Sequence, residues 1–229
     1  MVCRGDYERL GKIMKIAAVI VAAGCGKRFG SKKQFEFIGK RKVIDLTLSK
    51  FLKIADIKNI VLVLPKEDIE NVVRPFKVAS SVKIVPGGKT RQHSVFNGLT
   101  ALSPDTDIVL IHDGVRPFVS EKIIKDSIVS AKKYDACVVA TPSKDTVKIT
   151  KNGFVVSTPD RENIFLAQTP QVFRYSLIMA AYKKAFREKY FSTDDSALVE
   201  KLGKRVKIVS GDYKNIKITT REDLKSFTG

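Results

Sequence analysis

The residues best suited to chemistry lie in one stretch near the N-terminus, residues 22–34, which we call the glycine loop. Its glycines Gly24 and Gly26 leave backbone N–H groups unshielded, so a phosphate can approach them closely. Within seven residues the loop also carries four cations, Lys27, Arg28, Lys32 and Lys33. The loop directly follows the apolar run 16–21, which predicts a buried strand. Together these features indicate binding of a nucleoside triphosphate.

Neither of the common phosphate-binding motifs fits the glycine loop. A dinucleotide fingerprint needs a third glycine where Phe29 stands, and Gly30 comes one residue late. A P-loop would end in Gly-Lys-Ser or Gly-Lys-Thr, whereas this chain has Gly30-Ser31-Lys32. An ordinary strand-to-helix turn with exposed lysines therefore stays open as the alternative, although the density of positive charge disfavours it.

A second candidate site follows the apolar run 108–112. Asp113 stands at the expected carboxyl end of a central strand, which is where open α/β sheets bind ligands. Its carboxylate is a ligand type that Mg²⁺ prefers, and Arg116 could hold a phosphate by a bidentate contact. The alternative is a plain Asp113–Arg116 ion pair that closes a turn. We expect His112 to pack at the strand end rather than to act as a base.

The remaining signals are weaker. Gly87 and Gly88 precede an expected helix, and Ser94 offers a hydroxyl to the edge of a base, but a simple loop with a helix cap explains this pattern equally well. Spacing alone does not single out the polar residues near later strand ends, which are Arg161, Thr169, Thr193, Asp194 and Lys217.

Short apolar runs alternate with amphipathic stretches, a pattern that predicts an α/β fold with a mainly parallel sheet flanked by helices. We expect strands at 16–22, 60–64, 82–86, 108–112, 136–141 and 206–210. The expected helices are 43–53, 66–76, 91–101, 121–134 and 174–188, a short one after Thr193, and one from Thr220, which has capping-box spacing to Asp223. The expected organisation is a single domain at 14–229, preceded by an extension at 1–13.

Residues 144–163 interrupt this alternation with the pattern of a β-hairpin. Asn152-Gly153 separates the strand-like runs 146–149 and 154–157, which is a strong hairpin signal. A lone hairpin is only marginally stable in water, so it must pack against something, either a second subunit or another part of the same domain. We call residues 142–165 the arm.

The formal net charge of +18 is carried mostly by lysines spread along the chain. With no Trp, 8% aromatic residues and no recognisable DNA- or RNA-binding module, this charge predicts a solvated surface and anionic small substrates, not a nucleic-acid partner. No apolar stretch has the length of a membrane span, and Cys3, Cys25 and Cys137 lack the spacing of a metal site. These features predict a cytoplasmic protein without a membrane partner.

Several motifs of this chain occur in the same order in one known family. They are Ala-Ala-Gly-x-Gly-x-Arg from Ala22, Lys33-Gln34, Gly-Gly-x-x-Arg-x-x-Ser-Val from Gly87, His-Asp-x-x-Arg-Pro from His112, Asp-Thr-Val-Lys from Asp145, Thr-Pro-Gln from Thr169 and Asn-Ile-Lys-Ile-Thr from Asn215. From about Met14 to Phe227 the chain thus resembles the 2-C-methyl-D-erythritol 4-phosphate cytidylyltransferases. The resemblance implies a Rossmann-like domain whose hairpin arm crosses to a second subunit in a homodimer.

The resemblance also implies roles for individual residues. Arg28 and Lys33 would stabilise the transition state at the α-phosphate of CTP, and Arg161 and Lys217 would position the sugar phosphate. The implied nucleotide-binding set is Ala22, Ala23, Gly24, Gly26, Gly88, Lys89 and Ser94, in which the backbone of Ala22, Ala23 and Gly88 and the side chain of Ser94 select cytosine. The methylerythritol phosphate site would be lined by Asp113, Arg116, Thr146 and Thr169, with Thr146 and Arg161 reaching over from the partner's arm. Lys32 replaces a frequent proline and Gly114-Val115 a frequent Ala-Ala, but neither departure removes a charge that the chemistry needs.

The expected reaction is in-line attack of the substrate phosphate on the α-phosphorus of CTP, which releases pyrophosphate. Mg²⁺ or another divalent cation is the expected cofactor, with Asp113 as its ligand. A phosphate monoester is largely dianionic at neutral pH, so no general base is required. The alternative is a ribitol-5-phosphate cytidylyltransferase, which shares most of these motifs, but Arg161 within Asp-Arg-Glu-Asn favours the methylerythritol enzyme.

Overall fold

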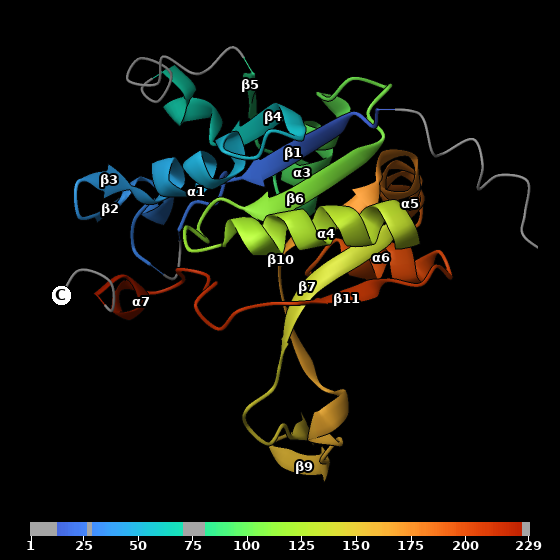
Figure 1. The fold of residues 1–229 in the computed structure, drawn as a ribbon. Coiled ribbons are helices and arrows are strands. Elements are labelled where there is room, and N and C mark those ends of the chain that lie inside the picture. The colour runs from blue at the N-terminus through green and yellow to red at the C-terminus, as the bar shows by residue number, and fades with distance from the viewer. Residues whose placement is uncertain (1–12, 27–28, 71–80, 226–229) are drawn as a thin grey trace, which may run out of the picture.

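The apolar runs of the chain assemble into a seven-stranded sheet with the order β11-β7-β10-β6-β1-β4-β5 (Figure 1). The computed structural model describes residues 13–26, 29–70 and 81–225. The strands of this sheet are β1 (Ile16–Val21), β4 (Ile57–Leu64), β5 (Val82–Pro86), β6 (Ile108–Asp113), β7 (Ala136–Pro142), β10 (Phe165–Arg174) and β11 (Lys207–Ser210). Six of them run parallel, and β10 is antiparallel to both of its neighbours, β6 and β7. The predicted mainly parallel α/β sheet is confirmed.

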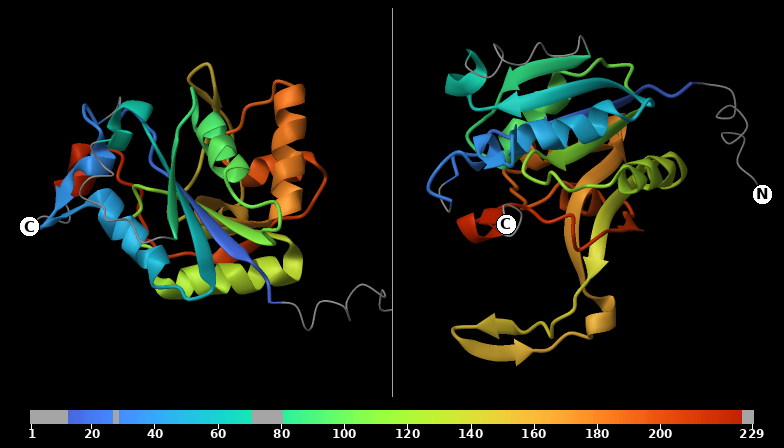
Figure 2. Two further views of the ribbon diagram at one scale, coloured as in Figure 1. Left: turned by 90° about the horizontal axis from the view of Figure 1, so that it is seen from above. Right: turned by 60° about the vertical axis from the view of Figure 1, so that its left-hand side comes forward.

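Helices cover both faces of the sheet, as Figure 2 (left) shows. One face packs against α1 (Val43–Leu52) and α4 (Glu121–Tyr134), and the other against α3 (Arg91–Thr100), α5 (Tyr175–Arg187) and α6 (Ser196–Lys201). The central strand β1 supplies both cores because its side chains alternate: Ile16, Ala18 and Ile20 face α1 and α4, whereas Ala17 and Val19 face the other layer. A strand buried on both faces has to be apolar throughout, which explains the continuous apolar run in the sequence.

Strand β10 is absent from the strands predicted from the sequence. It contains Pro170, and a proline inside an apolar run argues against a central strand because proline cannot donate to the ladder. The structure accommodates Pro170 at an irregularity between Ala167 and Gln171, where the pairing of β10 with β7 shifts register. The local sequence pattern around Pro170 therefore does not predict β10, although this strand lies near the middle of the sheet.

The remaining short elements complete the domain. They are η1 (Lys33–Phe35), β2 (Phe37–Ile38), β3 (Arg41–Lys42), η2 (Lys66–Asp68), η3 (Arg161–Asn163) and α7 (Arg221–Lys225). The predicted capping box before α7 is confirmed, since the Asp223 amide donates to Thr220 Oγ1 and the Thr220 amide donates to Asp223 Oδ2. Of the helix predicted at 66–76, residues 71–76 lie outside the described residues, as do residues 1–12 of the expected extension.

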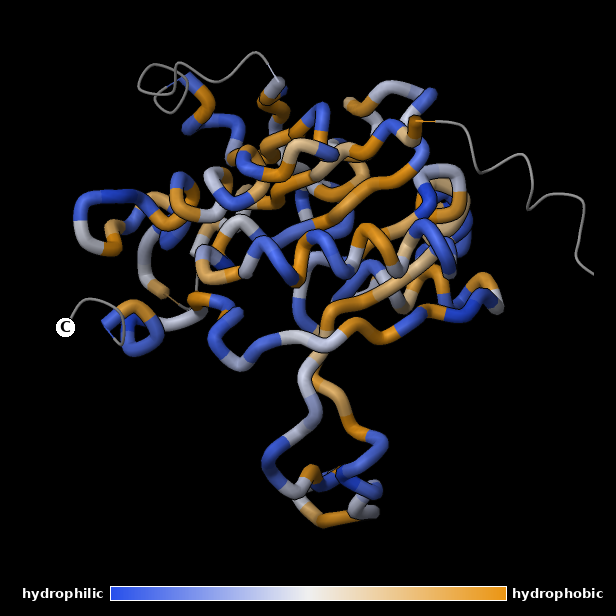
Figure 3. Tube along the Cα trace, viewed as in Figure 1, coloured by the Kyte–Doolittle hydropathy of each residue, from blue (hydrophilic) through white to orange (hydrophobic). Residues whose placement is uncertain are grey.

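The arm projects away from the domain and ends in a two-stranded hairpin, β8 (Ile149–Lys151) and β9 (Phe154–Ser157) (Figures 1 and 2). Asn152 and Gly153 both have positive φ, 52° and 83°, as a two-residue hairpin turn requires. The hairpin prediction is confirmed, but the predicted first strand at 146–149 starts three residues and ends two residues too early, because β8 reaches the turn directly. Apolar residues at the tip of the arm are exposed (Figure 3), with Phe154 78% and Val156 62% accessible.

Among the described residues, the longest helices are too short and too polar to cross a bilayer.

Candidate active site

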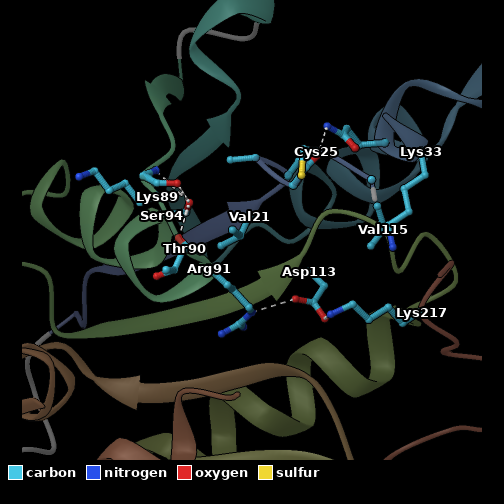
Figure 4. A pocket seen from close by; sticks show the side chains of 16 residues that line it. Val21, Cys25, Lys33, Lys89, Thr90, Arg91, Ser94, Asp113, Val115 and Lys217 are labelled. Atoms are coloured by element: carbon cyan, nitrogen blue, oxygen red, sulfur yellow. Dashed lines mark hydrogen bonds and ion pairs between the residues drawn. The ribbon is translucent and has the colours of Figure 1, made fainter. Parts of the chain in front are cut away.

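The site lies where the order of the strands reverses. The chain passes from β1 to β4 on one side and later returns to β6 on the other, which leaves a crevice beyond the carboxyl ends of these strands. A cavity of about 550 Å³ opens there. Its wall is formed by the glycine loop after β1, by residues 88–91 and Ser94 after β5, by Asp113 and Val115 after β6, and by Lys217 from the C-terminal segment (Figure 4).

The glycine loop is held in shape by the side chain of Gln34 and by a conformation at Gly26 that only glycine adopts without strain. Gly26 has a φ of 71°, and a Cβ added to it would lie 1.7 Å from the carbonyl oxygen of Ser31. Gln34 is almost fully buried and donates from Nε2 to the carbonyl of Gly24 at 3.1 Å. The loop therefore folds back on itself, and this fold brings Lys33 to the cavity wall.

The turn after β5 is closed by a helix cap and a serine. Thr90 is the N-cap of α3 and accepts a hydrogen bond from the His93 amide at 3.2 Å. Ser94 accepts a hydrogen bond at Oγ from the Gly88 amide at 3.0 Å and donates to the Thr90 carbonyl at 2.9 Å. A Cβ at Gly87 would meet Ala23 Cβ at 2.2 Å, so the turns after β1 and β5 touch at this point.

Three cations converge on the buried carboxylate of Asp113. Lys217 Nζ lies 3.0 Å and Arg116 Nε 3.3 Å from Oδ2, and Arg91 Nε lies 3.4 Å from Oδ1. Arg91 and Lys217 approach from opposite sides in Figure 4. Burial alone would raise the pKa of Asp113, but attraction by Arg91, Lys217 and Arg116 outweighs it and holds the pKa well below its ordinary value. Asp113 is therefore ionised throughout the physiological range.

Lys217 reaches Asp113 because the C-terminal segment is fastened to the turn after β6. The Ile218 amide donates to the Val115 carbonyl at 3.0 Å, and Arg116 Nη1 donates to the Asn215 carbonyl at 2.8 Å. The ion pair between Asp113 and Arg116, which the sequence analysis gave as the alternative, is present. Arg116 lies behind Asp113 and does not line the cavity.

His112 is fully buried and has both ring nitrogens engaged. Thr169 Oγ1 lies 3.0 Å from Nδ1 and accepts the Asp113 amide at 3.1 Å, so its proton points to the histidine. The other nitrogen, Nε2, then donates to the Arg116 carbonyl at 3.2 Å. Burial lowers the pKa of His112 to about 4. As expected from the sequence, His112 packs at the strand end, where it is a neutral structural residue.

The structure brings together most of the residues that the sequence analysis assigned to the site. Ten of them line the cavity: Ala22, Ala23, Gly24, Gly26, Lys33, Gly88, Lys89, Ser94, Asp113 and Lys217. Arg116 and Thr169 contact Asp113 from behind. Thr146 and Arg161 lie on the arm and do not line the cavity of their own chain, and Arg28 lies outside the described residues.

Arg91 was missed as a site residue, although it lines the cavity. The signal was the Gly-Gly-x-x-Arg motif, in which Arg91 directly follows the N-cap of α3. Cys25 also lines the cavity, without an acid–base partner in the described part of the chain that would make it a nucleophile.

The donor set at Asp113 can be compared with what a divalent metal needs. Within residues 13–26, 29–70 and 81–225, no three His, Cys, Asp or Glu side chains gather as they would around a metal held by protein alone. Asp113 supplies one carboxylate that faces the cavity. Mg²⁺ commonly keeps water and substrate phosphates as most of its ligands and takes only one or two carboxylates. The residues present therefore fit a magnesium ion that is carried by a triphosphate.

Comparisons with known proteins agree on one family. A family model described as 2-C-methyl-D-erythritol 4-phosphate cytidylyltransferase matches residues 16–227. The enzyme of that name from Geotalea uraniireducens is 45% identical over 219 residues, which cover 92% of this chain and 94% of the relative. Among solved structures, 4-diphosphocytidyl-2C-methyl-D-erythritol synthase from Anaerococcus prevotii superposes with a TM-score of 0.86 at 40% identity and covers 95% of this chain and 98% of its own. The Thermus thermophilus cytidylyltransferase gives 0.79 at 31% identity, with 94% and 98% covered.

Proposed function

The chain belongs to the 2-C-methyl-D-erythritol 4-phosphate cytidylyltransferase family, and from this premise we propose how its cavity carries out the transfer. The enzyme is a nucleotidyltransferase that makes 4-diphosphocytidyl-2-C-methyl-D-erythritol and pyrophosphate from CTP and 2-C-methyl-D-erythritol 4-phosphate. The glycine loop would hold the triphosphate, and the turn after β5 would hold the base.

The observation that carries this proposal is the convergence of Lys33, Asp113 and Lys217 on one cavity. These residues come from three distant segments: the loop after β1, the end of β6 and the C-terminal segment. Two ammonium groups in a partly enclosed space suit a polyphosphate, because they stabilise charge that develops in the transition state without reorganising. Arg28, in the same loop as Lys33, is proposed to add a third cation.

The attacking group would be the phosphate of the sugar substrate, which needs no deprotonation at neutral pH. The cavity agrees with this, because its candidate base, His112, is buried behind Asp113 with both nitrogens engaged. Catalysis would then consist of alignment and charge stabilisation. Ser94 and the backbone of Ala22, Ala23 and Gly88 would recognise cytosine, with Gly24, Gly26 and Lys89 along the triphosphate.

Asp113 would hold Mg²⁺, and the bound ion would neutralise phosphate charge during transfer. Asp113 also orients Lys217, whose Nζ lies 3.0 Å from Oδ2, so one carboxylate would serve the metal and the ammonium group together.

The arm is proposed to complete the site of a second copy of this chain in a homodimer. Its exposed apolar tip needs a partner, and Arg161 and Thr146 stand too far along the arm to line their own cavity. Within the chain, Arg161 donates to the Lys144 carbonyl at 3.3 Å, which keeps its guanidinium on the arm. The cytoplasmic location expected from the sequence stays a prediction.

The test is a parallel assay of pyrophosphate release from CTP with 2-C-methyl-D-erythritol 4-phosphate and with ribitol 5-phosphate. We expect turnover with the first and at most slow turnover with the second. Mass spectrometry of the product identifies the diphosphocytidyl sugar. Equal or better turnover with ribitol 5-phosphate would overturn the assignment of substrate.

A further inference from the structure

We propose that Asp195 and Tyr182 are positioning residues, which hold the Arg91 guanidinium against the cavity wall and prevent it from closing over Asp113. The inference rests on the proposed function, since it concerns how the same cavity is kept open for CTP. It starts from the way in which Arg91 divides its donors between two carboxylates.

Arg91 makes two short hydrogen bonds to Asp195 and only one long contact to Asp113. Its Nη1 and Nη2 donate to the two oxygens of Asp195 at 3.0 and 2.8 Å, whereas Nε lies 3.4 Å from Asp113. A bidentate arginine–carboxylate pair fixes both the distance and the plane of the guanidinium. Asp195 therefore determines where Arg91 lies, and Asp113 receives the remaining donor.

The side chain of Asp195 binds Arg91 and does not cap helix α6. Asp195 is the N-cap of α6, yet its side chain makes no capping hydrogen bond. The neighbouring Asp194 caps the helix instead, by accepting the Ala197 amide at 3.1 Å. The backbone of Asp195 is fixed by Gln171 of β10, whose Oε1 accepts the Asp195 and Ser196 amides at 3.0 and 2.9 Å. The carboxylate is thus free to face Arg91 although it is 1% exposed.

Tyr182 supplies the third contact to this carboxylate. Its ring is fully buried and stacks on Phe96 of α3, and its hydroxyl donates to Asp195 Oδ1 at 2.5 Å. Tyr182 and Arg91 Nη1 thus donate to the same oxygen of Asp195, and the core between α3 and α5 helps to fix that carboxylate. The chain Tyr182–Asp195–Arg91–Asp113 runs without a break from the core to the cavity.

Fold stability alone does not explain the chain of contacts. A buried ion pair is often no more stabilising than apolar residues of the same volume, because two charges must be desolvated. The position of Arg91 matters to the cavity, since without Asp195 its bidentate edge would turn to Asp113, the next carboxylate within reach. Arg91 would then displace Lys217 and occupy the space in front of the glycine loop.

The experiment compares Tyr182→Phe with Tyr175→Phe. Tyr175 lies on the same helix, and its hydroxyl donates to the Leu99 carbonyl at 3.0 Å, away from the site. Each substitution removes one tyrosine hydroxyl, so both proteins are expected to melt slightly below wild type. We expect Tyr182→Phe to weaken CTP binding roughly five- to tenfold, the scale of one ordinary intramolecular hydrogen bond, and Tyr175→Phe to leave it within twofold. Isothermal titration calorimetry gives the dissociation constants, and steady-state kinetics should show the same change in the KM for CTP with kcat changed less.

A double-mutant cycle with Arg91→Lys tests whether Tyr182 acts through Arg91. Lysine keeps the charge but cannot make the bidentate contact, so Tyr182→Phe should have little further effect on CTP affinity in that background. An undiminished effect of Tyr182→Phe there, or equal CTP affinities for the two tyrosine variants, would refute the inference. Wild-type turnover is measured in the same series, so an inactive wild type would count against the proposed function alone.

Discussion

At the scale of single residues, the site depends on the charges gathered around Asp113. Its carboxylate holds the Lys217 ammonium group at 3.0 Å. The arrangement explains why Asp113 stays ionised although it is buried. Because Arg91 and Arg116 also contact this carboxylate, the removal of Lys217 leaves it less fully neutralised and weakens the attraction of the cavity for phosphate.

We expect Lys217→Met to lower kcat by about 10²–10³, the scale of one preorganised donor. Steady-state pyrophosphate release measures this, and Lys217→Arg should recover part of the rate because it restores the charge. The exposed neighbour Lys214 gives the matched control, since Lys214→Met removes the same charge three residues away. A Lys217→Met enzyme as fast as the control would exclude a role for this ammonium in catalysis.

His112 should make the fold less stable in mild acid. Its pKa is lowered to about 4 in the folded protein, against about 6.5 when unfolded, so between these values only the unfolded chain binds the proton. The free energy of unfolding should therefore fall as the pH drops from about 6.5 to about 4, by up to about 3 kcal/mol, and should lose no more from this residue below that range. Urea unfolding at a series of pH values measures the slope.

The chain has only two histidines, which allows the source of this slope to be identified by NMR. The His112 ring should stay neutral with the proton on Nε2 down to about pH 4. The control variant His93→Asn should keep the pH dependence. A His112 ring that takes up a proton near pH 6.5 would contradict the assignment.

At the scale of elements, the shape of the glycine loop depends on one backbone conformation. Gly26→Ala would place a Cβ at positive φ and against the Ser31 carbonyl, so the loop must rearrange. We expect a loss of about 1–3 kcal/mol in the free energy of unfolding, together with weaker CTP binding. Gly24→Ala is the control for stability, because a Cβ at Gly24 meets nothing within 4 Å. Equal melting temperatures for the two variants would show that the loop is not constrained in this way.

The regular elements could be predicted from the sequence where local pattern and final environment agree. The strands β1, β6 and β7 are largely apolar runs because both of their faces are buried. Helix α4 has the predicted bounds because Ser120 caps it and Asp135 ends it in a left-handed conformation. β10 could not be predicted, because its pairing with β6 and β7 depends on partners 23 to 66 residues away and its Pro170 argues locally against a strand.

The site was predicted best where motifs are short. Asp113 ends β6 and Lys33 lies in the loop that follows β1, and the carboxyl ends of neighbouring parallel strands meet at one edge of the sheet. Asp195 could not be found in this way, because its role follows from a helix cap supplied by its neighbour and from a tyrosine in a separate helix. Such contacts exist only after packing.

At the scale of the whole molecule, the arm predicts that two chains share each site. Arg161→Ala and Lys33→Ala should each be nearly inactive alone. If Arg161 serves the cavity of the other subunit, mixing the two variants after subunit exchange should restore up to about a quarter of the wild-type activity, because half of the dimers are mixed and each has one intact site. Without restoration, Arg161 would have to act within its own chain.

Phe154→Asp is the companion variant for assembly. It places a charge on the exposed tip of β9 and should shift the protein from dimer to monomer in light scattering, with the sheet intact by circular dichroism. An unchanged mass would show that the tip does not carry the association.

The arm begins and ends at one residue pair of the sheet. Pro142 at the end of β7 pairs with Phe165 at the start of β10, and the Ser143 amide donates to the Ile164 carbonyl at 2.8 Å just beyond them. The arm is thus an insertion between β7 and β10, two neighbouring antiparallel strands that pair with each other up to the point where the arm begins. Its length and composition can drift without any cost in strand pairing, so the part of the chain proposed to join subunits is also the part that the fold leaves most open to evolutionary change.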